Sequence, residues 1–487
     1  MMTGKGGLAM SHGTYAYSGL PGVSGRSAAA LPAERRPAVL TRRMLAGLGL
    51  GGALAGACQP GQRGGAGEQP RELKPVTLVW QIRGGPGGNY EKLATDAMQQ
   101  FRQKNPHITV QFVFDAGNVE KTLTMMVAGT GPDVFHGWGH VMWQYAAKEQ
   151  MINHNEIVRD FKKADLDDFM KWQWDGFVIP TTTFRFGLPT YVNMMVLYWN
   201  RDHFRQLGQA EPTVDWGHDE YAAMARRLTR REGDKQIYGA WIPMTAFDRF
   251  QNHVLMFGGH VVDPKDLTKT LLHEPPAQTA LEWMRARQWD DRTFLPIRSD
   301  LRPLPDKNQW DHFYLGHVST LEDGMHNLRG VAQNMTMDWD IAHVPKGPVR
   351  RAVLGTTDGW AIWSGTKARE AAVELLKFIT SVDYYKMQAT YELLIPSRKS
   401  VLDHWIATAR EQFPVLQKVN LKVVKEALVD MGYPTPDEIF LCQAEAAQVI
   451  GPALNQLYRD GTATPRIFQD IKDQINQAAG SCGVRFK

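Results

Sequence analysis

The sequence predicts an α/β fold made of two units in series, and two observations predict it. Apolar runs suited to buried strands alternate with amphipathic helical patterns from Val76 onward. The same alternation begins again after Gly187, and the segment after Ala368 is predicted to be mostly helical. Such alternation favours a largely parallel sheet covered by helices on both faces.

Each unit is predicted to open with a buried strand and to continue with alternating helices and strands. In the first unit we expect strands over 76–82, 107–114 and 133–135, with helices over 89–105 and 122–128. In the second unit we expect strands over 194–199 and 236–241, with helices over 216–228 and 276–289. Asn89 is the expected N-cap of the first helix, and Pro106 ends that helix.

Residues 41–58, TRRMLAGLGLGGALAGAC, are predicted to be an export signal that ends at a lipid attachment site. The twin arginines Arg42 and Arg43 precede a charge-free run over 44–57. That run is shorter than the roughly 20 residues that a membrane-spanning helix needs, but it suits the apolar core of a signal peptide. Cys58 would carry the lipid, so we expect the rest of the chain to work outside the cytoplasmic membrane.

The net charge of +4 comes from the N-terminal segment before Cys58, which we call the leader. Six basic residues and one acidic residue lie within 1–57, so the rest of the chain has a formal charge of about −1. A basic surface for nucleic acid is therefore not predicted. Residues 59–74 are rich in Gly, Pro and polar residues, and we expect them to form a flexible tether.

Two cysteines, Cys442 and Cys482, remain when Cys58 is assigned to the lipid. An exported protein allows the two to form a disulfide, which would close a loop of about 40 residues and stabilise the fold by about 4 kcal/mol. Two unpaired thiols are the alternative, and the sequence does not choose between them.

The sequence contains no convincing catalytic or metal-binding motif. A G-x-G-x-x-G pattern at 47–52 lies in the leader with no strand before it. His273-Glu274 runs into two prolines and lacks the second histidine of a zinc protease motif. We therefore expect no enzyme activity, no cofactor and no metal. The loop GGPGG at 84–88 is either a tight turn or an anion cradle at a helix N-terminus.

Four tryptophans stand near the ends of predicted strands or in the loops after them: Trp80, Trp138, Trp241 and Trp360. Ligands of open α/β sheets bind beyond the carboxyl ends of the strands. Aromatic faces there, beside carboxylates and amides, suit a sugar. Each tryptophan taken singly fits a core position better, and only their grouping favours a binding site.

Segments in a fixed order along the chain carry a family resemblance. They are FRQKNPHITVQF, VAGTGPDVF, GLPTYVNMMVLYWNRDHFRQLG, WGHDEYAAMARRL, FGGHVVD, GHVSTLEDGMHN, AHVPKGP, TTDGWAIWSGTKAREAAVELLKFITS and LLIPSRKSV. In this order they resemble the family 1 extracellular solute-binding proteins of ABC importers, the group that includes maltose-binding proteins. The resemblance covers nearly all of the chain after the leader.

The resemblance implies a two-lobed type II periplasmic-binding-protein fold, with two α/β lobes joined by hinge strands and a helical C-terminal region. After a leader over 1–58, it implies a first lobe over 75–192 plus 356–400 and a second lobe over 193–355 plus 401–487. Such lobes close on a ligand that contacts both. The implied protein is a lipid-anchored monomer that binds a sugar, oligosaccharide or glycoside and delivers it to an ABC permease.

The resemblance, together with the tryptophan pattern, also implies which residues face the ligand. They are Trp80, Gln81, Trp138, Tyr191, Asn193, Trp241, Arg249, Asn252, Glu322, Asp323, Asp358, Trp360 and Arg398. The family often ends its second-lobe turn with Gly-x-Trp, whereas this chain has Gly324-Met325-His326. The loss of that stacking surface predicts a ligand smaller or more polar than a maltodextrin.

Four alternatives stay open. A receptor that presents its ligand to a sensor rather than to a permease would have the same sequence features. A binder of glycerol phosphate or another anionic polyol would need converging cations, and the candidates are Arg83, Arg185, Arg249 and Arg398. A ferric binder would use adjacent tyrosines, but the pair Tyr384-Tyr385 matches no ligand loop. A secreted carbohydrate-active enzyme would need two carboxylates roughly 5 to 10 Å apart across the site.

Overall fold

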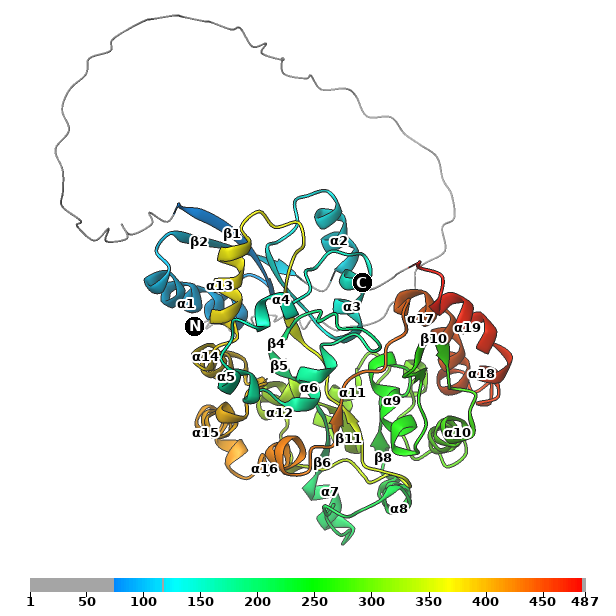
Figure 1. The fold of residues 1–487 in the computed structure, drawn as a ribbon. Helices are drawn as coiled ribbons and strands as arrows, with labels where there is room; N and C mark the ends of the chain where they lie inside the picture. The colour runs from blue at the N-terminus through cyan, green and yellow to red at the C-terminus, as the bar shows by residue number, and fades with distance from the viewer. Residues whose placement is uncertain (1–73, 116–117, 484–487) are drawn as a thin grey trace, which may run out of the picture. The chain divides into compact units, whose positions relative to one another are not determined.

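The computed structural model describes residues 74–115 and 118–483, within one compact unit, Arg71–Lys487. The predicted export signal, the lipidation site Cys58 and nearly all of the tether lie outside the described residues. Within the described part, no helix is both long and apolar enough to cross a membrane. Two five-stranded sheets with helices around them organise this unit, which confirms the prediction of two α/β units (Figure 1).

The first sheet has the strand order β2-β1-β3-β14-β4. Its strands are β1 (Val76–Arg83), β2 (Ile108–Asp115), β3 (Val134–Gly137), β14 (Gly359–Ile362) and β4 (Leu188–Pro189). Strand β1 pairs in parallel with β2 and β3, whereas β14 runs antiparallel to both of its neighbours. The prediction of a largely parallel sheet holds for three strands only, because β14 returns to this sheet from the other half of the chain.

The second sheet has the strand order β12-β6-β11-β8-β7. Its strands are β6 (Met195–Asn200), β7 (Arg230–Glu232), β8 (Lys235–Trp241), β11 (Val318–Gly324) and β12 (Trp339–Ala342). Only β11 and β8 are parallel, so the expected largely parallel sheet is wrong here. The alternating pattern shows that helices separate the strands, but it does not show that β6 inserts between β11 and β12.

We call the part built on the first sheet the first lobe and the part built on the second sheet the second lobe. Short extended segments connect them. Strand β5 (Tyr191–Val192) pairs with β15 (Ile395–Pro396), and β13 (Val353–Leu354) pairs with β16 (Pro434–Thr435). The chain therefore passes between the lobes at neighbouring positions. A separate hairpin joins β9 (Val262–Asp263) and β10 (Asp266–Thr270).

Helices surround both sheets. They are α1 (Asn89–Lys104), α2 (Val119–Val127), α3 (Gly139–Ala147), α4 (Asn155–Val158), α5 (Lys163–Asp167), α6 (Lys171–Gly176), α7 (Arg201–Gln206), α8 (His218–Leu228), α9 (Phe247–Met256), α10 (Pro275–Trp289), α11 (Gln309–Tyr314), α12 (Leu328–Asn334), α13 (Arg369–Ile379), α14 (Val382–Glu392), α15 (Leu402–Gln412), α16 (Lys422–Lys425), α17 (Gln443–Leu454), α18 (Ile467–Asp470) and α19 (Lys472–Ala479). Most predicted elements are confirmed within a few residues. Asn89 is not the N-cap of α1, because the helix already starts there and Gly88 precedes it.

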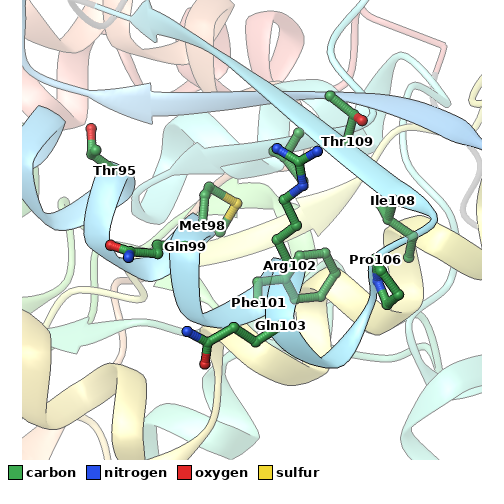
Figure 2. A pocket seen from close by; sticks show the side chains of 10 residues that line it. Thr95, Met98, Gln99, Phe101, Arg102, Gln103, Pro106, Ile108 and Thr109 are labelled. Atoms are coloured by element: carbon green, nitrogen blue, oxygen red, sulfur yellow. The ribbon is translucent and has the colours of Figure 1, made fainter.

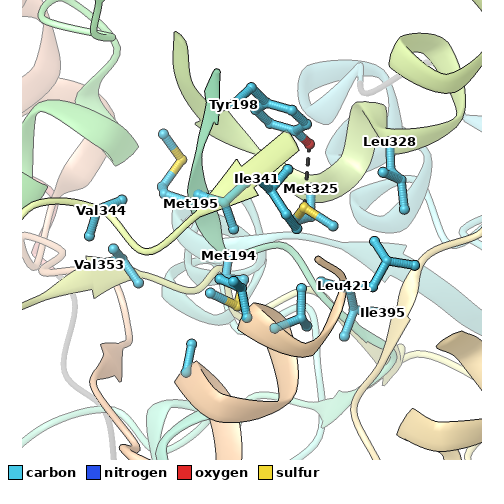
Figure 3. Close-up of a cluster of buried hydrophobic side chains, with 14 of the residues drawn as sticks. Met194, Met195, Tyr198, Met325, Leu328, Ile341, Val344, Val353, Ile395 and Leu421 are labelled. Carbon is cyan, nitrogen blue, oxygen red and sulfur yellow. Dashed lines mark hydrogen bonds between the residues drawn. The ribbon is translucent and has the colours of Figure 1, made fainter. Parts of the chain in front are cut away.

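Alternate residues of a strand face opposite helical layers in the first lobe. Trp80 and Trp360 pack with α1 and α13 in one cluster, whereas Ala361 packs with α3 in another. In the second lobe, Tyr198 and Met325 belong to a large apolar cluster beside the sheet (Figure 3). Burial of these faces stabilises each lobe by roughly 25 cal/mol for every Å² of apolar surface removed from water.

Residues 436–442, which we call the strap, contact both lobes. Ile439 packs in the α3 cluster of the first lobe, and the next residue, Phe440, packs among the helices of the second lobe. The Glu438 carboxylate accepts a hydrogen bond from the backbone N–H of Val261 at 2.6 Å. The strap thus ties the lobes together after the last crossing of the chain.

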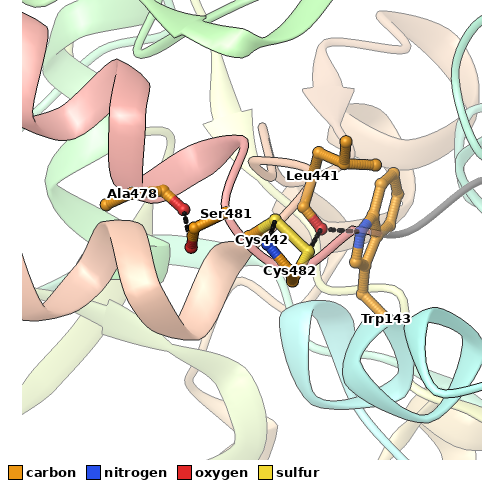
Figure 4. Close-up of a disulfide and its surroundings, with 6 residues drawn as sticks. All are labelled: Trp143, Leu441, Cys442, Ala478, Ser481 and Cys482. Atoms are coloured by element: carbon orange, nitrogen blue, oxygen red, sulfur yellow. Dashed lines mark hydrogen bonds between the residues drawn. A yellow bond between two sulfur atoms is a disulfide. The ribbon is translucent and has the colours of Figure 1, made fainter.

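A disulfide between Cys442 and Cys482 closes the end of the strap (Figure 4). The indole Nε1 of Trp143, on α3, donates to the carbonyl oxygen of Leu441 at 3.4 Å. The open question of the two cysteines is answered by this bond, which fixes the end of α19 to the strap.

Candidate functional site

The ends of β1, β3 and β11 bring polar side chains from both lobes to one region, which we call the junction. Arg83 ends β1, His136 lies in β3, and residues 322–324 end β11. Tyr191 and Asn193 lie where the chain first crosses between the lobes. Ligands of open α/β sheets bind beyond the carboxyl ends of strands, so the junction is the candidate site.

Arg83 organises the first-lobe side of the junction. Its Nη1 donates a short hydrogen bond to the Tyr191 hydroxyl. Its guanidinium carbon lies 5.8 Å from the Tyr191 ring centroid and 6.0 Å from that of Trp138. The His136 ring stacks on Tyr191, with centroids 6.0 Å apart. Burial, with a smaller contribution from Arg83, lowers the pKa of His136 to about 3, so this ring is neutral.

Asp358, in the segment between β13 and β14, completes the first-lobe side of the junction. Its carboxylate accepts from the Thr356 hydroxyl, and its backbone carbonyl accepts from the Thr190 N–H at 2.9 Å. Burial raises the pKa of Tyr191 well above its usual range, and the Asp358 carboxylate contributes in the same direction. Tyr191 is therefore a neutral phenol between a cation and a carboxylate.

Arg249 and Asp323 form the second-lobe side. Arg249, near the start of α9, makes a short ion pair with the fully buried Asp323 carboxylate. That carboxylate also accepts from the Gly324 N–H at 2.7 Å and from Gln309 Nε2 at 3.3 Å. Charge-assisted hydrogen bonds of this kind hold both partners in one geometry.

His326 is where the two sides meet. Its backbone N–H donates to Asn193 Oδ1 at 3.1 Å, and its Nδ1 lies 3.3 Å from the same oxygen. Burial lowers the pKa of His326 well below its usual range, and Arg249 and Arg83 both add to this effect. One neutral imidazole therefore lies in the electrostatic field of arginines from different lobes. Gly324 permits this approach, because an added Cβ would lie 2.5 Å from Asn193 Oδ1.

Trp310 supplies an aromatic side chain that the sequence analysis missed. Its ring lies edge-on to the His326 ring at 6.4 Å and contacts Tyr198 at 5.2 Å. It sits in the first turn of α11, where the Asn308 side chain accepts from its backbone N–H at 2.8 Å. The junction therefore has an aromatic group beside the position where Gly-x-Trp is replaced.

Five of the expected ligand residues have other contacts in this structure. Trp80 and Trp360 pack against each other in the core at 5.4 Å, with Trp80 fully buried. Gln81 points to the opposite face, where its Nε2 donates to the Thr122 hydroxyl at 2.9 Å. Asn252 Nδ2 donates to Glu322 Oε1 at 3.1 Å, and both side chains lie fully buried behind Asp323.

Three further candidates lie away from the junction contacts. Trp241 ends β8 and packs in the apolar cluster of the second lobe. Arg398 donates to the carbonyl oxygens of Thr380 and Asp165, both at 2.8 Å. Arg185 donates to the Trp174 carbonyl oxygen at 2.7 Å. Of the four cations considered for an anionic ligand, only Arg83 and Arg249 meet at the junction.

The sequence analysis also missed His136, His326 and Glu392 as candidate site residues. His136 lies near the end of β3, and His326 occupies the position of the absent tryptophan. The end of a strand and the departure from the family pattern were therefore the signals that could have identified them. Glu392 ends α14, and burial raises its pKa to about 7, with Arg329 and Arg83 opposing the shift. Nothing in the local sequence indicates that α14 ends near Arg83.

Metal binding has no support in the part of the chain that the structure describes, where no group of three or more His, Cys, Asp or Glu side chains could hold an ion. The tyrosine pair considered for iron is also buried. Tyr384 packs against Trp80 at 6.3 Å, and the Tyr385 hydroxyl donates to the Pro189 carbonyl oxygen at 2.6 Å.

A surface hollow of about 630 Å³ lies between α1 and β2 (Figure 2). Its lining includes Met98, Phe101, Arg102 and Ile108. It shares no residue with the junction, and none of the expected ligand residues lines it.

Similar proteins point to one family. The model described as bacterial extracellular solute-binding protein matches residues 96–415. A protein of Brucella abortus (strain 2308), named as a binding protein, is 23% identical over 350 residues, which cover 69% of this chain and 79% of that protein.

Solved structures share the fold. The ABC substrate-binding protein from Listeria monocytogenes in complex with cycloalternan has a TM-score of 0.70 at 21% identity, covering 84% of this chain and 100% of that chain. The sugar-binding protein MalE from Xanthomonas citri has a TM-score of 0.67 at 18% identity, covering 83% of this chain and 97% of that chain. These matches confirm the two-lobed periplasmic-binding-protein fold predicted for this chain.

Proposed function

Because this chain belongs to the family of bacterial extracellular solute-binding proteins, we propose that it binds a sugar, oligosaccharide or glycoside at the junction. The observation that carries the proposal is the hydrogen bond from the His326 N–H to Asn193 of the crossing, at a position where the charges of Arg83 and Arg249, from different lobes, both lower the His326 pKa. A ligand that bonds to groups of both lobes stabilises the arrangement in which they face each other. The bound form then delivers the ligand to a membrane permease, and no bond is broken.

The charges at the junction favour a neutral ligand. Arg83 and Arg249 are matched by the carboxylates of Asp323 and Asp358. Guanidinium and carboxylate groups bond well to hydroxyls, and the half-buried ring of Trp138 can pack on the apolar face of a sugar. The ligands named for two similar structures, cycloalternan and an unspecified sugar, are also carbohydrates.

An anionic polyol is the second candidate, because two arginines do converge. It is weaker than the first, since Arg249 already pairs with a buried carboxylate and the other two candidate cations lie elsewhere. Sugar phosphates that outcompete the matching neutral sugars would favour this candidate.

A thermal-shift screen of sugars, polyols and sugar phosphates tests the proposal. A ligand at a hundred times its dissociation constant should stabilise the folded protein by about 2.7 kcal/mol. Trp138→Ala should weaken binding about tenfold or more while the protein stays folded. Trp289→Ala, which removes a half-buried tryptophan of α10, is the matched control and should leave affinity unchanged. The site assignment fails if both variants bind as the parent does, and the function fails if no carbohydrate gives a shift or if a bound glycan is hydrolysed.

The location and the partners are part of the same proposal. We infer an exported monomer that Cys58 anchors to the outer face of the cytoplasmic membrane through a lipid. The export signal at 41–58 and the family support this placement. A tether of about 15 residues would let the lobes reach a permease in the same membrane.

A further inference from the structure

One face of α9 contacts the end of β11 through three side chains. Arg249, Asn252 and His253 are spaced at i, i+3 and i+4, so they share a face of the helix. Arg249 pairs with Asp323, while Asn252 and His253 both contact Glu322. The helix therefore meets both carboxylates of the strand.

Behind Asp323, a line of buried polar groups runs from Glu322 to the backbone. Glu322 Oε2 lies 3.3 Å from His253 Nε2, and His253 Nδ1 lies 2.9 Å from His218 Nε2. His218 Nδ1 lies 3.2 Å from the carbonyl oxygen of Lys346. The three side chains are at most 4% exposed.

The carbonyl oxygen of Lys346 determines which nitrogens of His218 and His253 carry protons. A carbonyl oxygen only accepts, so His218 Nδ1 carries a hydrogen. Burial, and to a lesser degree His253, lowers the pKa of His218 to about 3, so its Nε2 is bare and accepts. His253 Nδ1 must then donate to it. The remaining nitrogen, His253 Nε2, faces a carboxylate oxygen.

Neither His253 Nε2 nor Glu322 Oε2 has a hydrogen-bond partner in the described structure, and their own 3.3 Å contact is not a formed hydrogen bond. A bare nitrogen and an ionised oxygen would both be acceptors, buried without a donor between them, which is costly. We propose that His253 and Glu322 share one proton in the folded protein, and that this proton fixes α9 against β11. The two are positioning residues, because they hold the elements that present Arg249 and Asp323.

Asn252 extends the same contact to the crossing between the lobes. Its Nδ2 donates to Glu322 Oε1, and its Oδ1 accepts from the Leu354 N–H at 2.6 Å. Two hydrogen bonds through Asn252 thus join the Glu322 carboxylate to β13. This inference goes beyond the proposed function, since it does not depend on which ligand binds.

The groups around the pair belong to four elements. They are His218 and Tyr221 of α8, Arg249 of α9, Trp283 of α10 with Arg287 over its ring, and Asp323 of β11. The Trp283 ring stacks on His253 at 5.3 Å, and Asp323 is paired with Arg249. Burial and the Glu322 charge raise the pKa of Tyr221 far above neutral, so it does not titrate near pH 7.

The pH dependence of unfolding tests the proposal. Above about pH 6.5 an unfolded histidine is neutral and an unfolded glutamate is ionised, so the unfolded chain holds no proton at these two positions. The folded pair holds one, and stability must fall as pH rises. Between pH 7 and 9, each pH unit should lower the folded-to-unfolded ratio of the parent protein. This decrease should be up to tenfold greater than the decrease in Glu322→Gln.

Glu322→Gln is chosen because its amide satisfies the same contacts without the extra proton. The amide N–H₂ donates to the bare His253 Nε2, and the amide oxygen accepts from Asn252. Asp340→Asn is the matched control, since it converts another buried carboxylate of the same sheet, paired with Arg201, to an amide. This control should keep the pH slope of the parent. Equal slopes in the parent and Glu322→Gln would overturn the proposal.

A second measurement on the parent protein does not require the variant to fold. In protein labelled with ¹⁵N-histidine and ¹³C-glutamate, NMR at pH 8 should find one proton on either His253 Nε2 or the Glu322 carboxyl. A bare Nε2 beside an ionised Glu322 would refute the shared proton.

Discussion

His136 shows what burial does to a single residue at the junction. Its ring lies between Tyr191 and Trp360, at 6.0 and 5.2 Å, and its Nε2 has no partner in the described structure. The folded protein therefore favours the neutral ring, while an unfolded histidine takes up a proton near pH 6.5.

The sign of the resulting pH effect follows directly. Below pH 6.5 the unfolded chain binds a proton that the folded chain refuses, so stability falls as pH falls. From pH 6.5 to 5, His136 alone should cost about 2 kcal/mol. His136→Phe, which keeps an aromatic ring, should lose this part of the acid sensitivity in urea unfolding at pH 7 and pH 5. His107→Gln, in the partly exposed turn before β2, is the control, and identical behaviour of the two variants would contradict the assignment.

The family resemblance, and not local composition, gave the expected positions of Arg249, Asp323, Asn193 and Asp358. Trp80 could not be placed correctly, since every residue of VTLVW is apolar or small and the alternation that selects a face is hidden. In the structure its partners on β1 face the same helices, which makes it a core residue.

At the level of elements, the strap and the disulfide determine how the C-terminal helices attach. Trp143 of the first lobe and Leu267 of the second both bond to the backbone of Leu441, at 3.4 and 2.9 Å. Cys442 follows directly, and its disulfide fixes this doubly bonded position to the end of α19. The sequence could show that the cysteines were free to pair, but spacing alone does not reveal that both lie beside the strap.

Removal of the disulfide should destabilise the protein without changing the lobes. The bond closes a separation of 40 residues, for which the chain-entropy model gives about 4 kcal/mol. The double variant Cys442→Ser/Cys482→Ser should therefore unfold at lower urea concentration, and reduction of the parent should have the same effect. Cys58→Ser removes the remaining cysteine as a control and should unfold as the parent does. An unchanged midpoint in the double variant would mean that the bond contributes nothing.

At the scale of the whole molecule, two α/β units and their order along the chain could be predicted, because strand and helix periods differ. Strand direction could not, since β14 and β6 pair with strands far away in sequence. The contact between Asn193 and His326 is equally hidden, because it forms only when the crossing and the end of β11 are both in place.

A ligand that contacts both lobes should change their relative arrangement. Small-angle X-ray scattering should show a smaller radius of gyration with the best carbohydrate from the screen than without it. Because Asn193 joins the first crossing to His326, Asn193→Ala should reduce both the affinity and the change in radius. An unchanged radius at saturating ligand would place binding within one lobe.

The pairing of β14 between β3 and β4 has a consequence for synthesis on the ribosome. Residues 134–137 are made long before residues 359–362, which pair with them. Until β14 is made, β3 lacks its neighbour and forms an exposed edge of the nascent first sheet. Exposed edges pair readily with other chains. We therefore expect fragments that end before residue 359 to aggregate, and nascent chains of this protein to depend on chaperones until β14 emerges.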